Sequence, residues 1–218
     1  MDEKSGEAIK AARSAYDRLT AAQQKLVRNY DLLSAAEQRY AVLTGQSPAF
    51  PDVSQEHWAY DAVRYVYQHQ VMFGDGNGNF APNDTMSRAM AWTALSRIAG
   101  DPLSESETAW YDAPRIWVQN SGLSDGTHPM LQITREQMAT MLYRYACASG
   151  FSTEERGNLS PFGDADKVSL WAEEAMSWAV GCELIQGRDV RKLAPQDNLS
   201  RAEAAALFYR FLHQFVNS

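Results

Sequence analysis

The sequence predicts an all-α protein with long loops, built from three related helix–loop–helix units behind a small helical segment. Two observations lead to this prediction. Apolar residues recur at the helical spacing i, i+3, i+4 and i+7 along most of the chain, and one local pattern of residues occurs three times. We find no convincing alternation of apolar and polar residues of the kind that a half-buried strand shows.

The N-terminal segment, residues 1–45, is predicted to form two or three short helices that act as a spacer. An amphipathic stripe marks the first of them. The pairs Thr20 with Gln23 and Ser34 with Glu37 have the spacing of capping boxes, in which a hydroxyl and an acid or amide satisfy the first backbone groups of a helix. We find no catalytic or ligating pattern in this segment.

Three copies of one pattern follow, at residues 50–100, 108–149 and 160–216. Each copy opens with an aromatic residue, one spacer residue and Asp, and closes with a hydroxyl residue and Arg that begin a second helix. The openings are Phe50-Pro51-Asp52, Trp110-Tyr111-Asp112 and Phe162-Gly163-Asp164, and the closings are Ser87-Arg88, Thr134-Arg135 and Ser200-Arg201. The Asp and Arg are 36, 23 and 37 residues apart, so we expect the middle copy to lack part of its loop.

Apolar spacing predicts the paired helices within the copies. First helices are expected around 59–66 and 172–179, second helices around 91–98, 138–145 and 204–211, loops with glycine at 74–82, 122–126 and 187–189, and polar linkers at 44–49, 100–108 and 149–161. One helix–loop–helix of this size cannot bury its apolar face alone, whereas three copies can share one core.

Bulk properties exclude several classes of protein. The net charge of −7 and the pI near 5.1 argue against a nucleic-acid binder. No apolar run reaches the roughly 20 residues of a membrane helix, so we expect no membrane insertion. Residues 1–7 are polar and charged, so we expect no signal peptide here, and an exported protein would be longer than this chain. Cys147 and Cys182 are expected to be buried thiols.

Metal and catalytic sites are not expected either. Asp75-x-Asn77-x-Asn79 resembles part of a calcium loop, but Phe80 and Met86 stand where an EF-hand needs Gly and an acid, which leaves only loose cation binding open. The four His residues lack ligand spacing, and no hydrolase, metalloprotease or P-loop motif occurs. We therefore expect no catalytic residues, no metal and no cofactor.

The closing motif suggests a binding site. Ser87, Thr134 and Ser200 are good N-cap residues, so each following Arg lies at the positive end of a helix dipole. This placement is favourable if an anion binds at the helix start, where backbone N–H groups are free and Arg adds a planar fork for a carboxylate. Alternatively, each Arg pairs with an Asp of a neighbouring copy, such as Asp52, Asp112 or Asp164, and both arrangements can hold in different copies.

The copies differ in ways that bear on such a site. Glu203 completes a capping box in copy three and Gln137 can do so in copy two, but Met90 cannot in copy one, so we expect the site at Arg88 to be weaker or altered.

The tryptophans are interpreted by position. Trp58 and Trp171 occupy equivalent places and either stack on a sugar or anchor their helix by burial. Core positions are expected for Trp92, Trp110, Trp117 and Trp178.

Together, the aromatic-x-Asp opening, the Trp-bearing helix, the G-x-G-x-G-x-F-x-P loop of residues 74–82 and Ser200-Arg201-Ala202-Glu203 resemble the S-layer homology repeat, over about three-quarters of the chain. The resemblance implies a pseudo-threefold helical spindle, without enzymatic activity, that binds an anionic secondary cell-wall polysaccharide bearing a pyruvate ketal in grooves between repeats. The candidate ligand-binding residues are Asp52, Trp58, Ser87, Arg88, Asp112, Thr134, Arg135, Asp164, Trp171, Ser200, Arg201 and Glu203.

On this interpretation the chain is a monomeric module that anchors a larger exported protein at the outer cell surface. Two alternatives stay open: a protein-interaction or self-assembly module that uses the helical spacer, and a fragment of an enzyme that acts on wall glycans.

Overall fold

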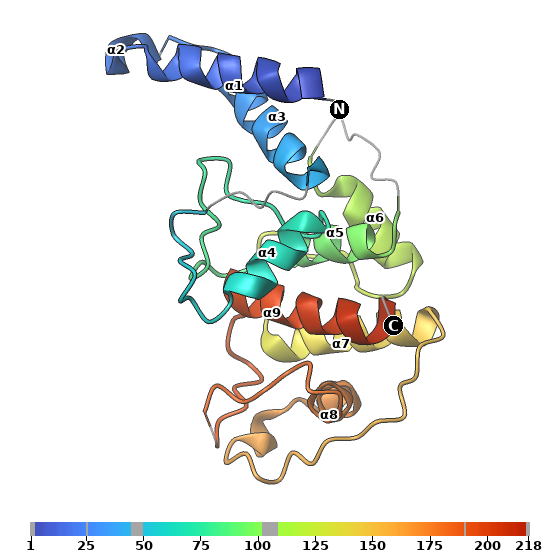
Figure 1. Cartoon of the computed structure of the whole chain (residues 1–218). Helices are drawn as coiled ribbons and strands as arrows, with labels where there is room; N and C mark the ends of the chain where they lie inside the picture. The colour runs from blue at the N-terminus through green and yellow to red at the C-terminus, as the bar shows by residue number, and fades with distance from the viewer. Residues whose placement is uncertain (1–2, 25, 45–49, 102–108, 190, 217–218) are drawn as a thin grey trace. The chain divides into compact units, whose positions relative to one another are not determined.

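The computed structural model describes residues 3–24, 26–44, 50–101, 109–189 and 191–216, and within these ranges it contains helices and no strands. The predicted all-α class is confirmed. Contacts divide the chain, which Figure 1 draws as a whole, into two compact units, Met1–Ala81 and Pro82–Ser218. The boundary falls inside copy one, whose first helix belongs to the first unit and whose second helix belongs to the second.

The first unit begins with a helical hairpin. Helices α1 (Glu3–Asp17) and α3 (Tyr30–Leu43) pack against each other, and the segment that connects them contains the short α2 (Ala21–Gln24). Arg13 fastens the hairpin, because its Nε and Nη2 donate to the two carboxylate oxygens of Glu37 at 2.6 and 2.5 Å.

One of the two predicted capping boxes is present in the hairpin. Thr20 N donates to Gln23 Oε1 at 2.9 Å and Gln23 N donates to Thr20 Oγ1 at 3.4 Å. The prediction of a capping box at Ser34 is wrong, because Ser34 lies inside α3 and the Glu37 carboxylate accepts from Arg13 instead.

The rest of the first unit is the opening half of copy one, with α4 (Tyr60–Gln68) as its helix. Asp52 holds the end of the following loop: its Oδ1 accepts from Phe80 N at 2.9 Å and its Oδ2 from Ala81 N at 2.7 Å. The Asp75 Oδ1 accepts from the amides of Asn77 and Asn79, at 2.8 and 3.1 Å. The acidic pattern of this loop thus stabilises a turn.

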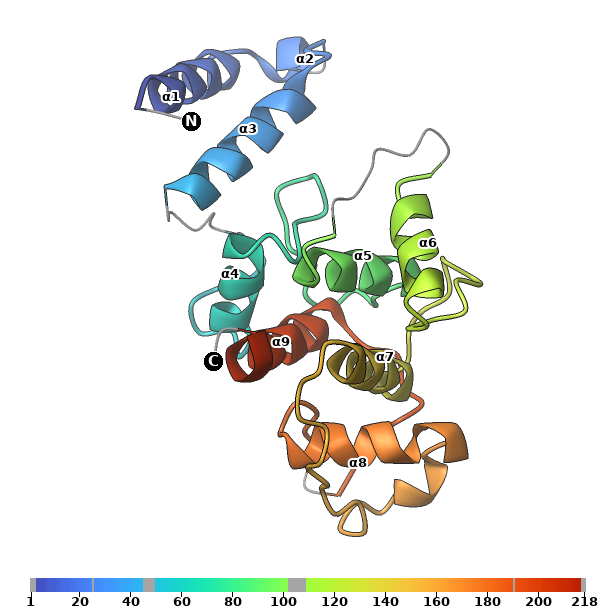
Figure 2. The same ribbon diagram turned by 90° about the vertical axis from the view of Figure 1, so that its right-hand side faces the viewer.

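The described part of the second unit holds five α-helices, which Figure 2 shows from a second side: α5 (Arg88–Ile98), α6 (Asp112–Asn120), α7 (Arg135–Ala148), α8 (Glu173–Gly181) and α9 (Arg201–Phe211). Short helical turns η1 (Ala165–Lys167) and η2 (Leu170–Ala172) precede α8, and the π-helical η3 (Leu212–Val216) follows α9. In both views α7 and α9 lie side by side. The helices predicted from apolar spacing are confirmed.

A closed ring of backbone hydrogen bonds joins the segments that precede α5, α7 and α9. Met86 N donates to Leu199 O at 2.8 Å, Leu199 N to Ile133 O at 2.9 Å, and Ile133 N to Met86 O at 2.9 Å. Because each residue directly precedes an N-cap, the ring holds the starts of the three closing helices together.

The structure corrects the alignment of copy two. Helices α4, α6 and α8 each have nine residues, and a left-handed residue follows each of them, at Gln70, Gly122 and Glu183. On this alignment Asp112 is the first residue of α6 and is not equivalent to Asp52 or Asp164.

The predicted shortening of copy two is confirmed in part. The offset from the left-handed residue to the N-cap is 17 residues from Gln70 to Ser87 and from Glu183 to Ser200, but 12 from Gly122 to Thr134. The remainder of the difference comes from equating Asp112 with the other opening aspartates. The residues just before Ala109, 102–108, lie outside the described ranges, as do residues 45–49 of the first predicted linker.

Candidate functional site

The hydroxyl residues before the closing helices are N-caps, as predicted. The side chains of Ser87, Thr134 and Ser200 accept from the third amide of their helices at 3.3, 3.3 and 3.2 Å. The expectation that Met90 cannot complete a capping box is wrong, because Ser87 N donates to Met90 Sδ at 3.5 Å. Copy one therefore has a capping box, as copies two and three do.

The expectation of free amides at the helix starts is also wrong. In α5 the Arg88 and Ala89 amides donate to carbonyls of copy two, Leu131 and Pro129, at 2.9 Å each. The first two amides of α7 donate in the same way to Asp197 and Pro195, and those of α9 to Asp84 and Pro82. Backbone carbonyls therefore already occupy the positive ends of the three helix dipoles.

The side chain of Arg88 reaches the short loop of copy two. Its Nε donates to Thr127 O at 2.9 Å, and its Nη2 donates to Ser124 Oγ at 3.2 Å and forms an ion pair with Asp125. Its guanidinium lies 5.6 Å from the centre of the Trp92 ring. Among the described residues its Nη1 has no hydrogen-bond partner, so one edge of the fork remains available.

Arg135 is more deeply enclosed, with 5% of its side chain exposed. Its Nε donates to Leu193 O at 3.0 Å, its Nη2 to Gln186 O at 2.6 Å, and its Nη1 to Glu203 Oε1 at 3.2 Å. Burial lowers the pKa of the Arg135 guanidinium, against the opposing effect of Glu203. Arg201 is also buried, with 7% exposed.

Arg88 lines a solvent-open cavity of about 290 Å³ in the second unit. Its polar and aromatic lining includes Arg144, Ser124, Asp125, Gln137 and Trp171. Arg144 is exposed, donates its Nη1 to Leu123 O at 3.2 Å, and forms no ion pair with any described residue. The cavity thus combines two cations, one of them without a carboxylate partner, with an indole ring.

Trp171 is held at this cavity by a buried acid. Glu136, only 4% exposed, accepts from Ser169 N at 3.0 Å and from Ser169 Oγ at 2.8 Å. Ser169 is the N-cap of η2, which carries Trp171. Glu136 and Ser169 are 33 positions apart in the chain, so local spacing does not predict this contact.

The opening aspartates have a structural role in this fold. Asp164 repeats the contacts of Asp52: its two oxygens accept from Leu193 N and Ala194 N, both at 2.8 Å. Burial opposes ionisation of Asp164, but these hydrogen bonds outweigh it and lower its pKa. Asp112 instead accepts from Arg115 Nε at 3.3 Å.

The alternative of a pair with an Asp of a neighbouring copy is correct for Arg88, although the partner is not an opening aspartate, and the partner of Arg135 is a glutamate instead. Arg88 pairs with Asp125 and Arg135 with Glu203. The Thr127 amide lowers the pKa of Asp125, with a smaller contribution from Arg88.

The tryptophans divide into exposed, half-buried and buried side chains. Trp58, Trp110 and Trp171 each directly precede the N-cap of α4, α6 or α8 and are 64%, 57% and 57% exposed. The core prediction is therefore wrong for Trp110, which is the copy-two equivalent of Trp58 and Trp171. Trp92 and Trp178 are buried as predicted, and Trp117 is half-buried.

The sequence contains a signal for Arg144 in addition to the closing motif. A second arginine follows nine residues after each motif arginine, at Arg97, Arg144 and Arg210. Arg210 Nη1 donates to Leu184 O at 3.0 Å, the counterpart of the bond from Arg144 to Leu123.

The prediction that both thiols are buried is wrong, because Cys147 is exposed and Cys182 is half-buried.

Within the described ranges, every helix is too short or too polar to cross a bilayer.

The fold and the site define a helical repeat module with an arginine-lined cavity on its second unit. A family model for the S-layer homology domain matches residues 49–91 and 161–205. The chain is 26% identical over 182 residues to an S-layer protein of Bacillus thuringiensis subsp. finitimus, which covers 77% of this chain and 22% of that protein. It is 33% identical over 169 residues to a surface-layer 125 kDa protein of Lysinibacillus sphaericus, covering 70% and 14% of the two chains.

The chain thus carries two S-layer homology domains recognised by the family model and is related over most of its length to bacterial S-layer proteins. An amylopullulanase of Thermoanaerobacterium thermosulfurigenes is 25% identical over 181 residues, which cover 77% of this chain but 10% of that protein. The chain therefore spans between a tenth and about a fifth of the length of these relatives.

Proposed function

We propose that this chain is a cell-wall anchoring module that binds an anionic, pyruvylated secondary cell-wall polysaccharide in the Arg88 cavity. The observation that carries the proposal is the meeting of Arg88, Arg144 and Trp171 at one open cavity. An arginine fork suits the carboxylate of a pyruvate ketal, and an exposed indole offers an apolar face for a sugar ring.

The charge of the cavity favours an acidic ligand. Arg144 has no ion-pair partner among the described residues. The carboxylate that faces Arg88 belongs to Asp125, whose side chain is 63% exposed. A bound carboxylate can take the free Nη1 edge of Arg88 and contact Arg144 without entering the buried part of the protein.

The domain family supports the same location and role. S-layer homology domains occur in cell-surface proteins, and anchoring to the wall fits this membership. We propose further that the three copies form a pseudo-threefold spindle, a view supported by the hydrogen-bond ring through Met86, Ile133 and Leu199.

We also propose that the module has no enzymatic activity of its own. Several relatives are named as enzymes, but the chain covers only 10% of the amylopullulanase. Such a short shared region fits an attachment module better than a catalytic domain. Turnover of purified wall glycan by this chain would favour the enzyme alternative.

The test is retention of the full chain on purified, protein-free wall polymer before and after removal of the pyruvate ketal. We expect retention that is lost with the ketal and reduced at least tenfold, about 1.4 kcal/mol, by Arg88→Ala. Arg156→Ala is the matched control, because Arg156 forms an exposed pair with Glu174 away from the cavity lining. Retention only by a protein partner would contradict the proposal.

A further inference from the structure

Equivalent positions near Arg88 and Arg135 differ in charge. Gln137, the third residue of α7, lines the Arg88 cavity. Its counterpart Glu203, the third residue of α9, receives a hydrogen bond from Arg135. A neutral amide at one site thus corresponds to a carboxylate at the other.

All three nitrogens of the Arg135 guanidinium are engaged by the protein, and only 5% of its side chain is exposed. Each of its three nitrogens donates to a protein oxygen, and the third bond goes to the Glu203 carboxylate. This carboxylate occupies the place at Arg135 that an acidic ligand would take.

Arg188 fixes the Glu203 carboxylate in this position. Its Nε donates to Oε1 at 2.8 Å and its Nη2 to Oε2 at 3.0 Å, while its Nη1 binds Asp197 at 2.7 Å. Ser200 N adds a bond to Oε2 at 2.8 Å. Burial raises the pKa of Glu203, but hydrogen bonds, chiefly those from Arg188, outweigh burial, so the pKa is lowered.

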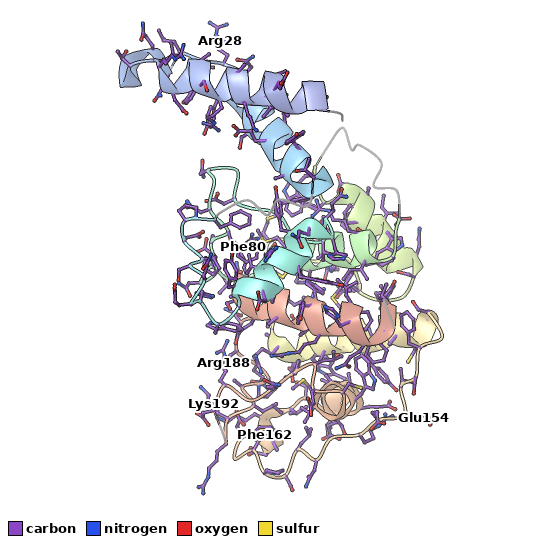
Figure 3. All side chains as sticks on the ribbon, in the orientation of Figure 1. Arg28, Phe80, Glu154, Phe162, Arg188 and Lys192 are labelled. Carbon is purple, nitrogen blue, oxygen red and sulfur yellow. The ribbon has the colours of Figure 1, made fainter. Side chains whose placement is uncertain are left out.

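We call Arg188 and the Glu203 carboxylate that it holds the clamp. Arg188, which Figure 3 labels, lies in the loop of copy three. Arg188 corresponds to Asp75 of copy one, since Asp75 N donates to Asn79 O and Arg188 N to Lys192 O, both at 2.8 Å. An acid at position 188 would repel Glu203. The clamp therefore depends on copy three having Arg at the position where copy one has Asp.

We infer that Glu203 and Arg188 close the Arg135 site to acidic sugars, so that the copies bind the polymer unequally and Glu203 decides which site is used. The sugar-binding half of this inference rests on the proposed function. The closure of the Arg135 site involves only Arg135, Glu203 and Arg188, so it can be tested without a sugar.

The binding test is calorimetric titration of the full chain with the methyl glycoside of pyruvate-ketal N-acetylmannosamine. Glu203→Gln removes the charge and keeps the cap, because Gln137 already accepts from Thr134 N in this way at 3.2 Å. We expect Glu203→Gln to raise the number of binding sites by one relative to the unmodified chain. Glu174→Gln, which removes a charge from an exposed pair, should not change it.

An unchanged number of sites in Glu203→Gln, with normal binding by the unmodified chain, would overturn the inference and leave the proposed function intact. Absence of binding by the unmodified chain would instead contradict the proposed function.

A second measurement decides the closure independently of any sugar. We expect the Arg135 Nε–H resonance to exchange with solvent at least tenfold faster in Glu203→Gln and in Arg188→Ala than in the unmodified chain. Equal exchange rates in all three proteins would overturn the closure.

Discussion

At the scale of single residues, the same residue type serves different purposes in different copies. Arg88 keeps an open edge at a cavity, whereas Arg135 is buried and each of its guanidinium nitrogens donates to a protein oxygen. The difference arises from their neighbours, since an exposed Asp125 faces one arginine and an enclosed Glu203 faces the other. The motif therefore predicts that an arginine lies at the start of each closing helix, while the residues around that arginine determine whether a ligand can reach it.

Glu136 is expected to matter for binding although it does not line the cavity. Removing its carboxylate in Glu136→Ala frees η2 and with it Trp171. Ordering that side chain again on binding costs about 1 kcal/mol, so affinity for the wall polymer should fall about fivefold.

The conservative variant separates positioning from overall stability. Glu136→Gln can still accept from Ser169 N and donate to Ser169 Oγ, so it should retain most of the affinity, as should the exposed control Glu173→Gln. Normal affinity in Glu136→Ala, measured on the same polymer, would refute this role.

At the scale of elements, the helices follow from local sequence while the loops depend on close packing. The copy-three loop passes under the opening aromatic residue at Gly187. A Cβ at this position would lie 2.5 Å from Asp189 O and 2.8 Å from Phe162 Cε1. Gly74 of copy one meets Phe50 in the same way, at 2.9 Å. Glycine is therefore required by the close approach of ring and backbone.

Gly187→Ala should destabilise the protein by about 1–3 kcal/mol, because the added methyl group overpacks the loop against Asp189 and the Phe162 ring. Gly163→Ala is the control, since its Cβ would meet Arg191 O at an ordinary 3.7 Å and should change stability by less than about 0.5 kcal/mol. Urea unfolding followed by circular dichroism measures both. Equal midpoints for the two variants would show that the loop relaxes around the methyl group.

Copy two shows how far element-level prediction extends. Apolar spacing located α7 correctly, because helix periodicity is a local property of the chain. The opening motif at Trp110 was misassigned, because an aromatic residue two positions before an Asp also occurs by chance at a helix start. The nine-residue length shared by α4, α6 and α8 is visible only once the helices are formed.

At the scale of the whole molecule, the second unit is held by contacts that close on themselves. The ring through Met86, Ile133 and Leu199 links residues far apart in the chain. Carboxylates reinforce it at a distance from the ring: Asp164 holds the segment before α9, and Glu203 joins α9 to α7 through Arg135.

Acid should destabilise the module. The pKa values of Asp164 and Glu203 are lowered by hydrogen bonds that outweigh burial, and that of Asp125 by the Thr127 amide. A lowered folded-state pKa contributes stability above the unfolded value, which is roughly 4 for these groups, and this stability is lost as pH falls through the folded value. The melting temperature should therefore be nearly constant from pH 7 to 5 and fall steeply below about pH 4.

Thermal melts of the unmodified chain and of Asp164→Asn from pH 7 to 3 provide the measurement. The variant cannot gain a proton at this site, so its melting temperature should start lower and decline less. A melting temperature that stays constant down to pH 3 in the unmodified chain would contradict the prediction.

The sequence by itself determined the helices, the three N-caps and the resemblance to S-layer homology repeats, because apolar spacing and capping act over three to seven neighbouring residues. Only the tertiary structure decided which arginine faces a cavity, which carboxylate pairs with it, and that backbone carbonyls fill the helix starts. Arg88 reaches a residue 39 positions away and Arg135 one 58 positions away. Contacts over such separations depend on how the copies close around one another, which local patterns do not encode.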